Sequence, residues 1–490
     1  MTFDLPLLVT FVIYLVLILV LGIKAYQRTH NLGDYILGGR KLGAVVTALS
    51  VGASDMSGWL LLGLPGAIYL AGLSEIWIGI GLVMGAWCNW FFVAKPLRVY
   101  SLAANKSLTL PDYFENRFHD STRLLRRVSA FVILLFFTFY TASGLVGGAI
   151  LFENSFCLDY RVALVTGALI IVSYTFIGGF LAVVWTDAIQ ALLMLLALIL
   201  APVLVISGSG GIDGVWEATR QVRPESTALL RNVGAVSLLS SLAWGLGYVG
   251  QPHILARFMA AESPMKLLAA RRIAMSWMIV VLLGSVTTGF AGIAYFANNP
   301  LSNPETVFIA LSQSLFNPWV AGVITAAILS AIMSTIDSQL LVCSSVISED
   351  FYRVFIKPRA SDKELLLVSR LAVVTIALIA LVIASDRTSR VLDLVSYAWA
   401  GFGAAFGPVI VFSLYWRRMT RNAAIAGMLV GSITVVIWSN MSGGVFDIYE
   451  ILPGFVFASL AILITSRLQP LQHDQTQAQF DASRRLIEAS

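Results

Sequence analysis

The chain has 490 residues, of which 58% are hydrophobic and only 12% are charged. Soluble domains carry roughly 25% charged residues, so this composition excludes an ordinary soluble protein and indicates an integral membrane protein. The net charge of +5 does not require a nucleic-acid partner, because basic loops on one side of a membrane explain it.

Apolar runs predict an all-α protein with about 13 transmembrane helices, each near the ~20 residues that a bilayer requires. The first run, residues 5–24, follows Asp4 rather than a basic segment and shows no small-residue cleavage site. We therefore expect a retained span and not a signal peptide. The other spans are expected at 41–71, 74–97, 124–151, 160–179, 187–208, 230–255, 273–295, 316–347, 364–385, 391–415, 422–440 and 446–466.

Lysine and arginine gather in the connections after the first, third, seventh, ninth and eleventh spans, where Arg40 and Arg257 are examples. These connections alternate so that they share one side, which the positive-inside rule makes the cytoplasm. We therefore expect the N-terminus outside the cell and the polar tail, residues 468–490, in the cytoplasm as a flexible segment. Within the large connection after the third span, TLPDYFENRF predicts a short surface helix entered at Pro111.

Two spans are unusually rich in glycine. The span 41–71 embeds Asp55 among small residues, and the span 230–255 contains SLLSSLAWGLGYVGQPH. Each alone fits close helix packing as well as it fits a broken helix that lines a cavity. Their pairing and the buried aspartate favour the cavity, because such pairs mark transporter binding sites. The two spans are five apart, and this odd offset gives them opposite orientations in the membrane. That arrangement predicts inverted repeats at about 41–208 and 230–415 within a single transporter domain, 1–467.

The sequence offers no sign of an enzyme. It contains no HExxH, GxSxG or P-loop motif and no paired catalytic carboxylates, and the missing P-loop also argues against an ATP-driven pump. The three cysteines and four histidines are scattered without metal-site spacing. The GxGxxG match at 245–250 lies within a membrane span and has no βαβ context, so we reject a dinucleotide site.

The ninth span carries a candidate ion site in AAILSAIMSTIDSQLL. Ala331, Ser334 and Thr335 share one helix face. A hard monovalent cation such as sodium prefers oxygen ligands, which hydroxyls and the free carbonyls of a break near Asp55 would supply. A single membrane serine or threonine more often bonds its own i−4 carbonyl, so the hypothesis depends on the combination with Asp55.

Long stretches of the chain resemble the sodium/solute symporter family, and most closely its proline-carrying bacterial members. The matching stretches are DYILGGR (34–40), TALSVGASDMSGWLLLGLPGA (47–67), LTLPDYF (108–114), YTFIGGFLAVVWTD (174–187), WGLGYVGQPHILARFMA (244–260) and SYAWAGFGAAFGP (396–408). The resemblance implies a LeuT-type core of ten helices in inverted repeats, with one helix before it and two after. It also implies sodium-coupled uptake of L-proline across the bacterial inner membrane.

The resemblance further implies particular site residues. The sodium ligands would be the carbonyls of Ala53, Met56 and Ala331 and the hydroxyls of Ser334 and Thr335, with Asp55 beside them. The solute-site positions would be Ser57, Gly58, Tyr140, Trp244, Tyr248 and Pro252. Residues affecting coupling and sodium exit on the cytoplasmic side would be Arg40 and Asp187. Asp337 carries no implied ligand role, and it stands either behind the ion site or towards a water-filled inner path.

The expected partners are sodium, L-proline and the lipid bilayer, with no nucleic acid and no obligatory protein partner. Symport of another small solute, such as an amino acid, organic acid or vitamin, stays open as an alternative. A membrane-embedded sensor is a weaker alternative, because it needs a signalling domain and the tail after Arg467 is too short to fold as one.

Overall fold

The computed structural model describes residues 5–27, 32–177, 179–230, 233–470 and 474–489. The regular secondary structure of the described residues is helical, apart from one isolated bridge between Leu42 and Ala261. The first half contains α1 (Leu5–Tyr26), α2 (Leu32–Leu37), η1 (Gly38–Arg40), α3 (Ala44–Asp55), η2 (Trp59–Gly63), α4 (Leu64–Ala71), η3 (Leu73–Glu75), α5 (Ile76–Cys88), η4 (Asn89–Val93), α6 (Ala94–Ala103), α7 (Leu110–Phe118), α8 (Leu124–Phe156), α9 (Tyr160–Ile177), α10 (Phe180–Gly208), α11 (Ile212–Val222) and η5 (Pro224–Thr227).

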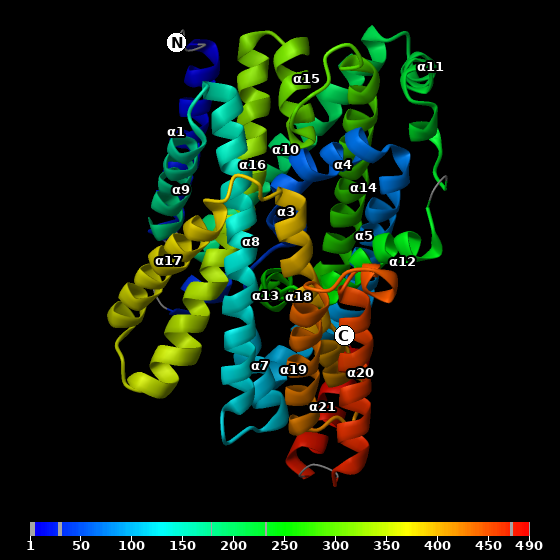
Figure 1. Cartoon of the computed structure of the whole chain (residues 1–490). Helices are drawn as coiled ribbons and strands as arrows, with labels where there is room; N and C mark the ends of the chain where they lie inside the picture. The colour runs from blue at the N-terminus through cyan, green and yellow to red at the C-terminus, as the bar shows by residue number, and fades with distance from the viewer. Residues whose placement is uncertain (1–4, 28–31, 178, 231–232, 471–473, 490) are drawn as a thin grey trace.

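The second half contains α12 (Ala235–Ala243), η6 (Trp244–Gly250), α13 (Pro252–Ala260), α14 (Pro264–Tyr295), η7 (Pro304–Thr306), α15 (Val307–Leu315), α16 (Pro318–Ser345), η8 (Val346–Ile356), α17 (Asp362–Ala384), α18 (Val391–Tyr415), α19 (Arg421–Trp438), η9 (Gly444–Asp447), α20 (Ile451–Leu468) and α21 (Asp474–Ala489). The N-terminal end of α1 lies at the upper end of the bundle with α11 and α15, and α7 and α21 lie at the lower end (Figure 1).

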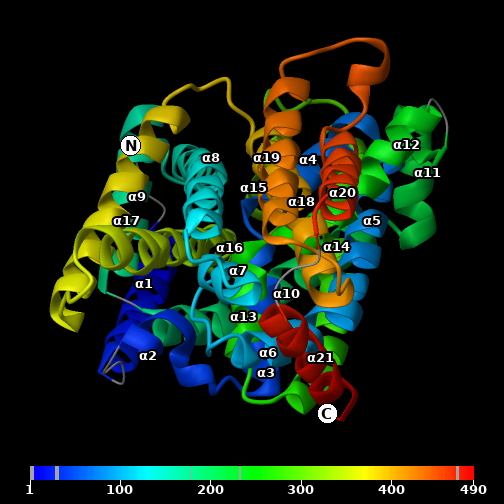
Figure 2. The ribbon, with the colours of Figure 1, turned by 90° about the horizontal axis from the view of Figure 1, so that it is seen from below.

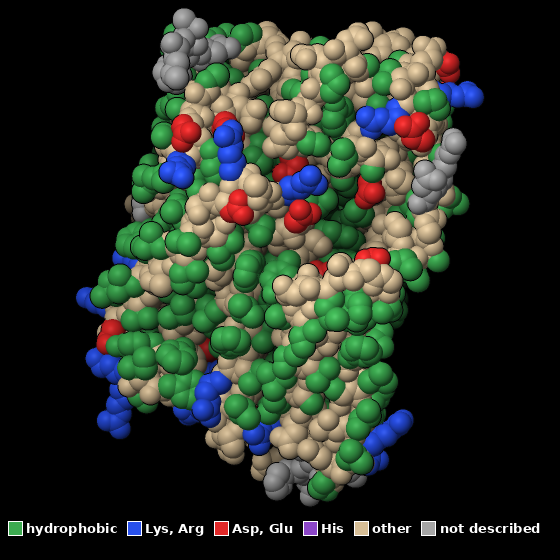
Figure 3. All heavy atoms as spheres, in the orientation of Figure 1, with side chains coloured by type: hydrophobic (Ala, Val, Ile, Leu, Met, Phe, Trp, Pro, Cys, Tyr) green, Lys and Arg blue, Asp and Glu red, His purple; other side chains and the backbone are tan. Residues whose placement is uncertain are grey.

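Within the described residues, ten helices are long and apolar enough to cross a membrane, and a bent pair formed by α3 and η2–α4 makes an eleventh span. Two shorter apolar stretches, Tyr160–Ser173 and Ala235–Gly250, stand where the remaining expected spans fall. This agrees with the prediction of about thirteen spans. In Figure 3, charged side chains form a band across the upper part of the face and a second group along its lower and left edges, and the surface between the two is mostly uncharged.

The core of the bundle is built from α16, α8 and α18. Buried residues make up 83% of the membrane-crossing stretch of α16 and η8, but only 28% of that of α1. Because lipid is as apolar as leucine, close packing and interhelical hydrogen bonds determine which helices are central. The polar and small residues of α16 therefore face protein, whereas the peripheral helices present Leu, Ile and Val to lipid.

Both glycine-rich spans are broken, as predicted. The first bends by 61° between α3 and the helix that begins at Trp59. In the second, α12 passes into the 3-10 segment η6, and a new helix, α13, begins at Pro252. Proline fits the first turn of a helix because its missing N–H would have no partner there.

The short surface helix is confirmed as α7, whose cap residue Thr109 accepts a hydrogen bond from the backbone N–H of Asp112 (3.1 Å). The expectation of a flexible tail is wrong for residues 474–489, which form the helix α21. Phe480 of α21 is buried and its ring lies 5.2 Å from the guanidinium carbon of Arg117. Asp481 forms an ion pair with Arg417 (2.9 Å). Seen from below, α21 lies beside α6 and α7 (Figure 2).

Candidate ion and solute site

The break after α3 faces the middle of α16, and four of the five expected sodium ligands meet there. The Ser334 hydroxyl lies 2.7 Å from the Ala53 carbonyl oxygen and 3.1 Å from that of Ala331. The Thr335 hydroxyl lies 3.4 Å and 3.3 Å from the same two carbonyls. All four residues are buried. These neutral oxygens match the preference of a hard cation, provided that the hydroxyl hydrogens turn away from it.

Met56, the fifth expected ligand, immediately follows α3. Its backbone angles are φ −82° and ψ 74°, so its carbonyl leaves the direction of the helical hydrogen bonds. Its N–H still donates to Gly52 (2.9 Å). The helix therefore ends on an intact turn and releases a carbonyl at the break, as a cation site at a discontinuous membrane helix requires.

Asp55 is the last residue of α3 and is only 2% exposed. One carboxylate oxygen accepts a hydrogen bond from the Tyr248 hydroxyl at 2.5 Å. The other is buried and has no hydrogen-bond partner among the described residues. A buried carboxylate satisfied on one side only favours a cation close by, because desolvation of an unpaired charge is costly. The Asp55 side chain thus fits the sodium that the neighbouring oxygens can hold.

The backbone of Asp55 organises the start of the next half-helix. Its carbonyl accepts hydrogen bonds from the Ser57 N–H and the Trp59 indole N–H, both at 3.0 Å, and from the Tyr140 hydroxyl at 3.5 Å. Gly58 is close to α16, because a Cβ there would stand 3.1 Å from Ile332. Ser57, Gly58, Tyr140 and Tyr248 therefore converge on the break.

Trp244 and Pro252 lie at the two ends of η6. Trp244 stacks on Tyr449 with ring centres 5.2 Å apart, and its carbonyl accepts a hydrogen bond from Trp399 (2.7 Å). Pro252 begins α13 and lines a separate pocket towards the α7 end of the bundle. The structure therefore brings Trp244 and Tyr248 into one segment, whereas Pro252 lines a pocket together with Arg257 and Ser338.

A second polar cluster lies on the α7 side of the ion-site oxygens. Arg257 of α13 forms an ion pair with Asp187 of α10 (2.8 Å) and donates to Ser338 of α16 (2.6 Å) and to Ser50 of α3 (2.7 Å). Ser338 in turn donates to the Ser334 carbonyl (2.7 Å). Arg257 thus ties four helices together one helical turn from Ser334.

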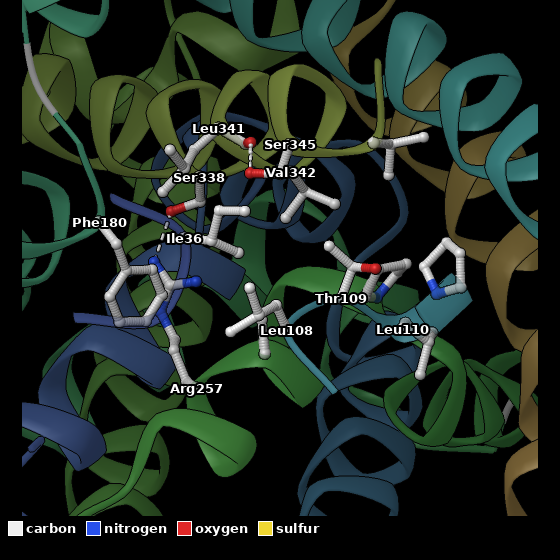
Figure 4. A pocket seen from close by; sticks show the side chains of 14 residues that line it. Ile36, Leu108, Thr109, Leu110, Phe180, Arg257, Ser338, Leu341, Val342 and Ser345 are labelled. Atoms are coloured by element: carbon white, nitrogen blue, oxygen red, sulfur yellow. Dashed lines mark hydrogen bonds between the residues drawn. The ribbon is translucent and has the colours of Figure 1, made fainter. Parts of the chain in front are cut away.

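The placement of Arg257 corrects the sequence analysis, which counted it among the loop cations. It is 1% exposed and lies inside α13. Its apolar neighbours in HILARFMA were the available signal, since a lone arginine in such a helix needs a partner. In Figure 4, Arg257 and Ser338 point towards each other at one end of a pocket whose other side carries Leu108, Thr109 and Leu110.

Arg40 secures the junction between α3 and α13. Its guanidinium donates to the carbonyls of Met259 (2.8 Å) and Ser107 (2.5 Å). Burial, with a smaller contribution from nearby Arg98, lowers the pKa of Arg40 to about 10. Next to it, Leu42 and Ala261 form the parallel bridge, in which Glu262 N–H donates to the Leu42 carbonyl (2.9 Å). The lower halves of both broken helices are therefore fastened to each other.

Asp337 of α16 makes its side-chain hydrogen bond to α9. One of its carboxylate oxygens accepts a hydrogen bond from the Thr175 hydroxyl of α9. The other oxygen has no hydrogen-bond partner among the described residues. This residue is fully buried, and its hydrogen bond joins α16 to α9 rather than to the α3 break.

Comparisons with known proteins agree with this architecture. Residues 35–431 match the model of the "Sodium:solute symporter family". The "Sodium/proline symporter" of Salmonella typhimurium is 56% identical, covering 96% of this chain and 94% of that relative. The "High-affinity proline transporter PutP" of Bacillus subtilis is 50% identical, covering 94% of this chain and 98% of that relative.

A sodium-coupled sialic acid symporter, solved in a substrate-bound outward-open state, superposes with a TM-score of 0.81 at 20% identity, covering 96% of this chain and 99% of that one. This shared fold is the expected LeuT-type arrangement of a multi-pass transporter. The chain belongs to the sodium:solute symporter family.

Proposed function

We propose that this protein is a secondary active transporter that couples sodium entry to uptake of L-proline across the bacterial cytoplasmic membrane. The observation that carries the solute assignment is the agreement of near-full-length relatives at 50% and 56% identity, both named for proline. Sodium coupling fits the family and the buried oxygen cluster at the α3 break. The membrane potential adds about 2.3 kcal/mol per charge per 100 mV to the driving force.

In this proposal sodium binds to the carbonyls of Ala53, Met56 and Ala331 and the hydroxyls of Ser334 and Thr335, with the Asp55 carboxylate beside it. The distances between the four clustered residues and the unpartnered Asp55 oxygen support this assignment. Sodium here is cargo.

Proline is a zwitterion with a compact apolar ring, and the proposed site has a feature for each part. The half-helix that starts at Ser57 and Gly58 presents its positive dipole end to the carboxylate. Tyr140, Trp244 and Tyr248 supply apolar walls with polar edges for the ring and the ammonium group. Pro252 lines the pocket that also contains Arg257, on the α7 side of this site.

We assign the α7 and α21 end to the cytoplasm and the N-terminus to the outside, on the evidence of the basic connections. Sodium then leaves past Ser338, Arg257 and Asp187, while Arg40 holds the lower halves of α3 and α13 together. Residues 1–467 form one transporter domain, and the two repeats cover about 41–208 and 230–415. The corresponding positions of the two helix breaks support this division.

The test is uptake of radiolabelled proline into proteoliposomes under an inward sodium gradient. We expect accumulation with sodium, none with an equal potassium gradient, and stimulation by an inside-negative potential. Other small amino acids, organic acids and vitamins are offered as competitors in the same assay. Sodium-dependent accumulation of one of these, with no proline uptake, would overturn the solute assignment but keep the coupling ion.

A further inference from the structure

The second break, η6, needs external support because its seven residues include three glycines and lack the α-helical hydrogen-bond pattern. Glycine leaves the backbone free to adopt many conformations, so such a segment does not fix the direction of its own side chains. Yet Trp244 and Tyr248, which wall the proposed solute site, both project from it. Neighbouring helices must therefore set their positions.

α18 supplies most of that support through Trp399, a residue that is 1% exposed. Its indole N–H donates to the Trp244 carbonyl at 2.7 Å. Its ring also meets the Tyr248 ring edge to face, with centres 5.0 Å apart and planes at 85°. One side chain therefore holds the backbone of the first aromatic wall and the ring of the second.

The glycines of η6 make this contact possible. A Cβ on Gly247 would stand 1.8 Å from the Trp399 indole nitrogen, and one on Gly250 would stand 2.1 Å from the Phe402 carbonyl oxygen. Any side chain at these positions would push η6 off α18. On the other flank, Asn89 donates to the Tyr248 carbonyl at 2.9 Å.

We propose that Trp399 is a positioning residue for the solute: it fixes the spacing of Trp244 and Tyr248 and thereby sets solute affinity and ring-size selectivity. The inference rests on the proposed solute site. Trp399 acts through the two aromatic walls. A phenylalanine in its place keeps a ring against Tyr248, so the hydrogen bond from Tyr248 to Asp55 is expected to survive the substitution.

The decisive variant is Trp399→Phe, which keeps an aromatic ring but removes the N–H donor. We expect the proline KM to rise on the order of tenfold, since a buried carbonyl that loses its donor is costly. Maximal uptake should stay within about twofold, and the sodium concentration for half-maximal uptake at saturating proline should not move. Azetidine-2-carboxylate has a smaller ring than proline and pipecolate a larger one. The ratio of each analogue's inhibition constant to the proline KM should differ between Trp399→Phe and the unmodified protein.

The matched control is Trp438→Phe. Trp438 of α19 also donates its indole N–H to a carbonyl, that of Ile448 at 3.0 Å, and also packs edge to face on a ring, Phe446. This control should leave the proline KM and the analogue ratio unchanged. Asn89→Ala is the second variant, and it should raise the proline KM in the same way if Trp399→Phe does not reach the membrane.

Equal behaviour of Trp399→Phe and Trp438→Phe would overturn the proposal. So would a loss of maximal uptake or of protein with KM and analogue ratio unchanged, because that pattern is structural damage. Trp244→Ala and Tyr248→Ala are measured alongside. If those two leave proline affinity unchanged, the solute site itself is wrong; if they weaken it and neither Trp399→Phe nor Asn89→Ala does, only the positioning role fails.

Discussion

The two helix breaks are held in place by different kinds of side chain. The break after α3 is short, and its end carries a charged residue, Asp55, whose backbone and side chain together hold Ser57, Trp59 and Tyr248. The η6 break is longer, contains no charged residue, and is held from outside by Trp399 and Asn89. A charge at one break suits an ion, and an adjustable aromatic segment at the other suits an organic solute.

This difference predicts that variants of Asp55 act mainly on sodium and that variants within η6 act mainly on proline. One hydrogen bond crosses between them, from Tyr248 to Asp55. Most of these residues therefore belong to one break, whereas Tyr248 and Asp55 connect the two.

The largest effect is expected for Asp55→Asn. Removing the charge from a low-dielectric site should lower apparent sodium affinity by roughly 100-fold or more and nearly abolish uptake at ordinary sodium concentrations. Asp55→Glu should retain more activity. Uptake as a function of sodium, with membrane protein quantified, measures this. If the Asn variant has a normal sodium dependence, the proposal that Asp55 at the first break takes part in sodium binding is wrong.

Arg257 should rank next, because it fastens α13 to α3, α10 and α16. Arg257→Gln leaves Asp187 as an unpaired buried charge, which typically costs about 3–5 kcal/mol. The double variant Arg257→Gln/Asp187→Asn should recover part of the lost stability and uptake. Thermal unfolding and uptake of Arg257→Gln, of Asp187→Asn and of the double variant measure the coupling. A double variant that is as damaged as the sum of the single variants would argue against the pair.

Ser334→Ala and Thr335→Ala should each weaken apparent sodium affinity by about five- to tenfold, a size typical of losing one hydrogen-bonding oxygen. The proline KM at saturating sodium should change little. Ser330→Ala, on the same helix but bonded to its own Ala326 carbonyl, is the control. Equal losses at all sodium concentrations would indicate packing damage instead of ligand loss.

Trp244→Ala should raise the proline KM with little change in sodium dependence, whereas Tyr248→Phe should affect both. The Tyr248 hydroxyl donates to Asp55, so its loss weakens the link between the breaks by about 1–3 kcal/mol, or roughly 5- to 150-fold. Proline uptake across a grid of sodium concentrations separates the two patterns. Identical patterns for both variants would contradict the division between the breaks.

Much of this site could be predicted from local sequence. The spacing of Ala331, Ser334 and Thr335 places them on one helix face. Asp55 within an apolar run indicates a functional site in the membrane. The glycines of the second break fitted both close packing and a cavity. The structure shows the packing, because a Cβ on Gly247 would stand 1.8 Å from the Trp399 indole nitrogen, and the cavity stays a prediction. The contact between η6 and α18 joins residues far apart in the chain, so no local sequence pattern indicates it.

Arg257 and the tail were misjudged for a related reason. Counting charges places every arginine near a span end in a loop, and only the ion pair with Asp187 of another helix shows that this one is buried. In the tail, polar composition hides a single anchor, Phe480, whose burial depends on Tyr100 and Arg117 far away in the chain. Both depend on long-range partners that one sequence does not display.

The central claim is that the ion at the first break preorganises the solute site that adjoins it, which isothermal titration of purified protein tests directly. Proline is titrated into protein in sodium buffer and in potassium buffer of equal ionic strength. We predict tighter proline binding in sodium by roughly 5- to 150-fold, and by linkage the same factor for sodium when proline is present. Equal proline affinity in the two buffers would contradict the account and assign Asp55 to folding or gating instead.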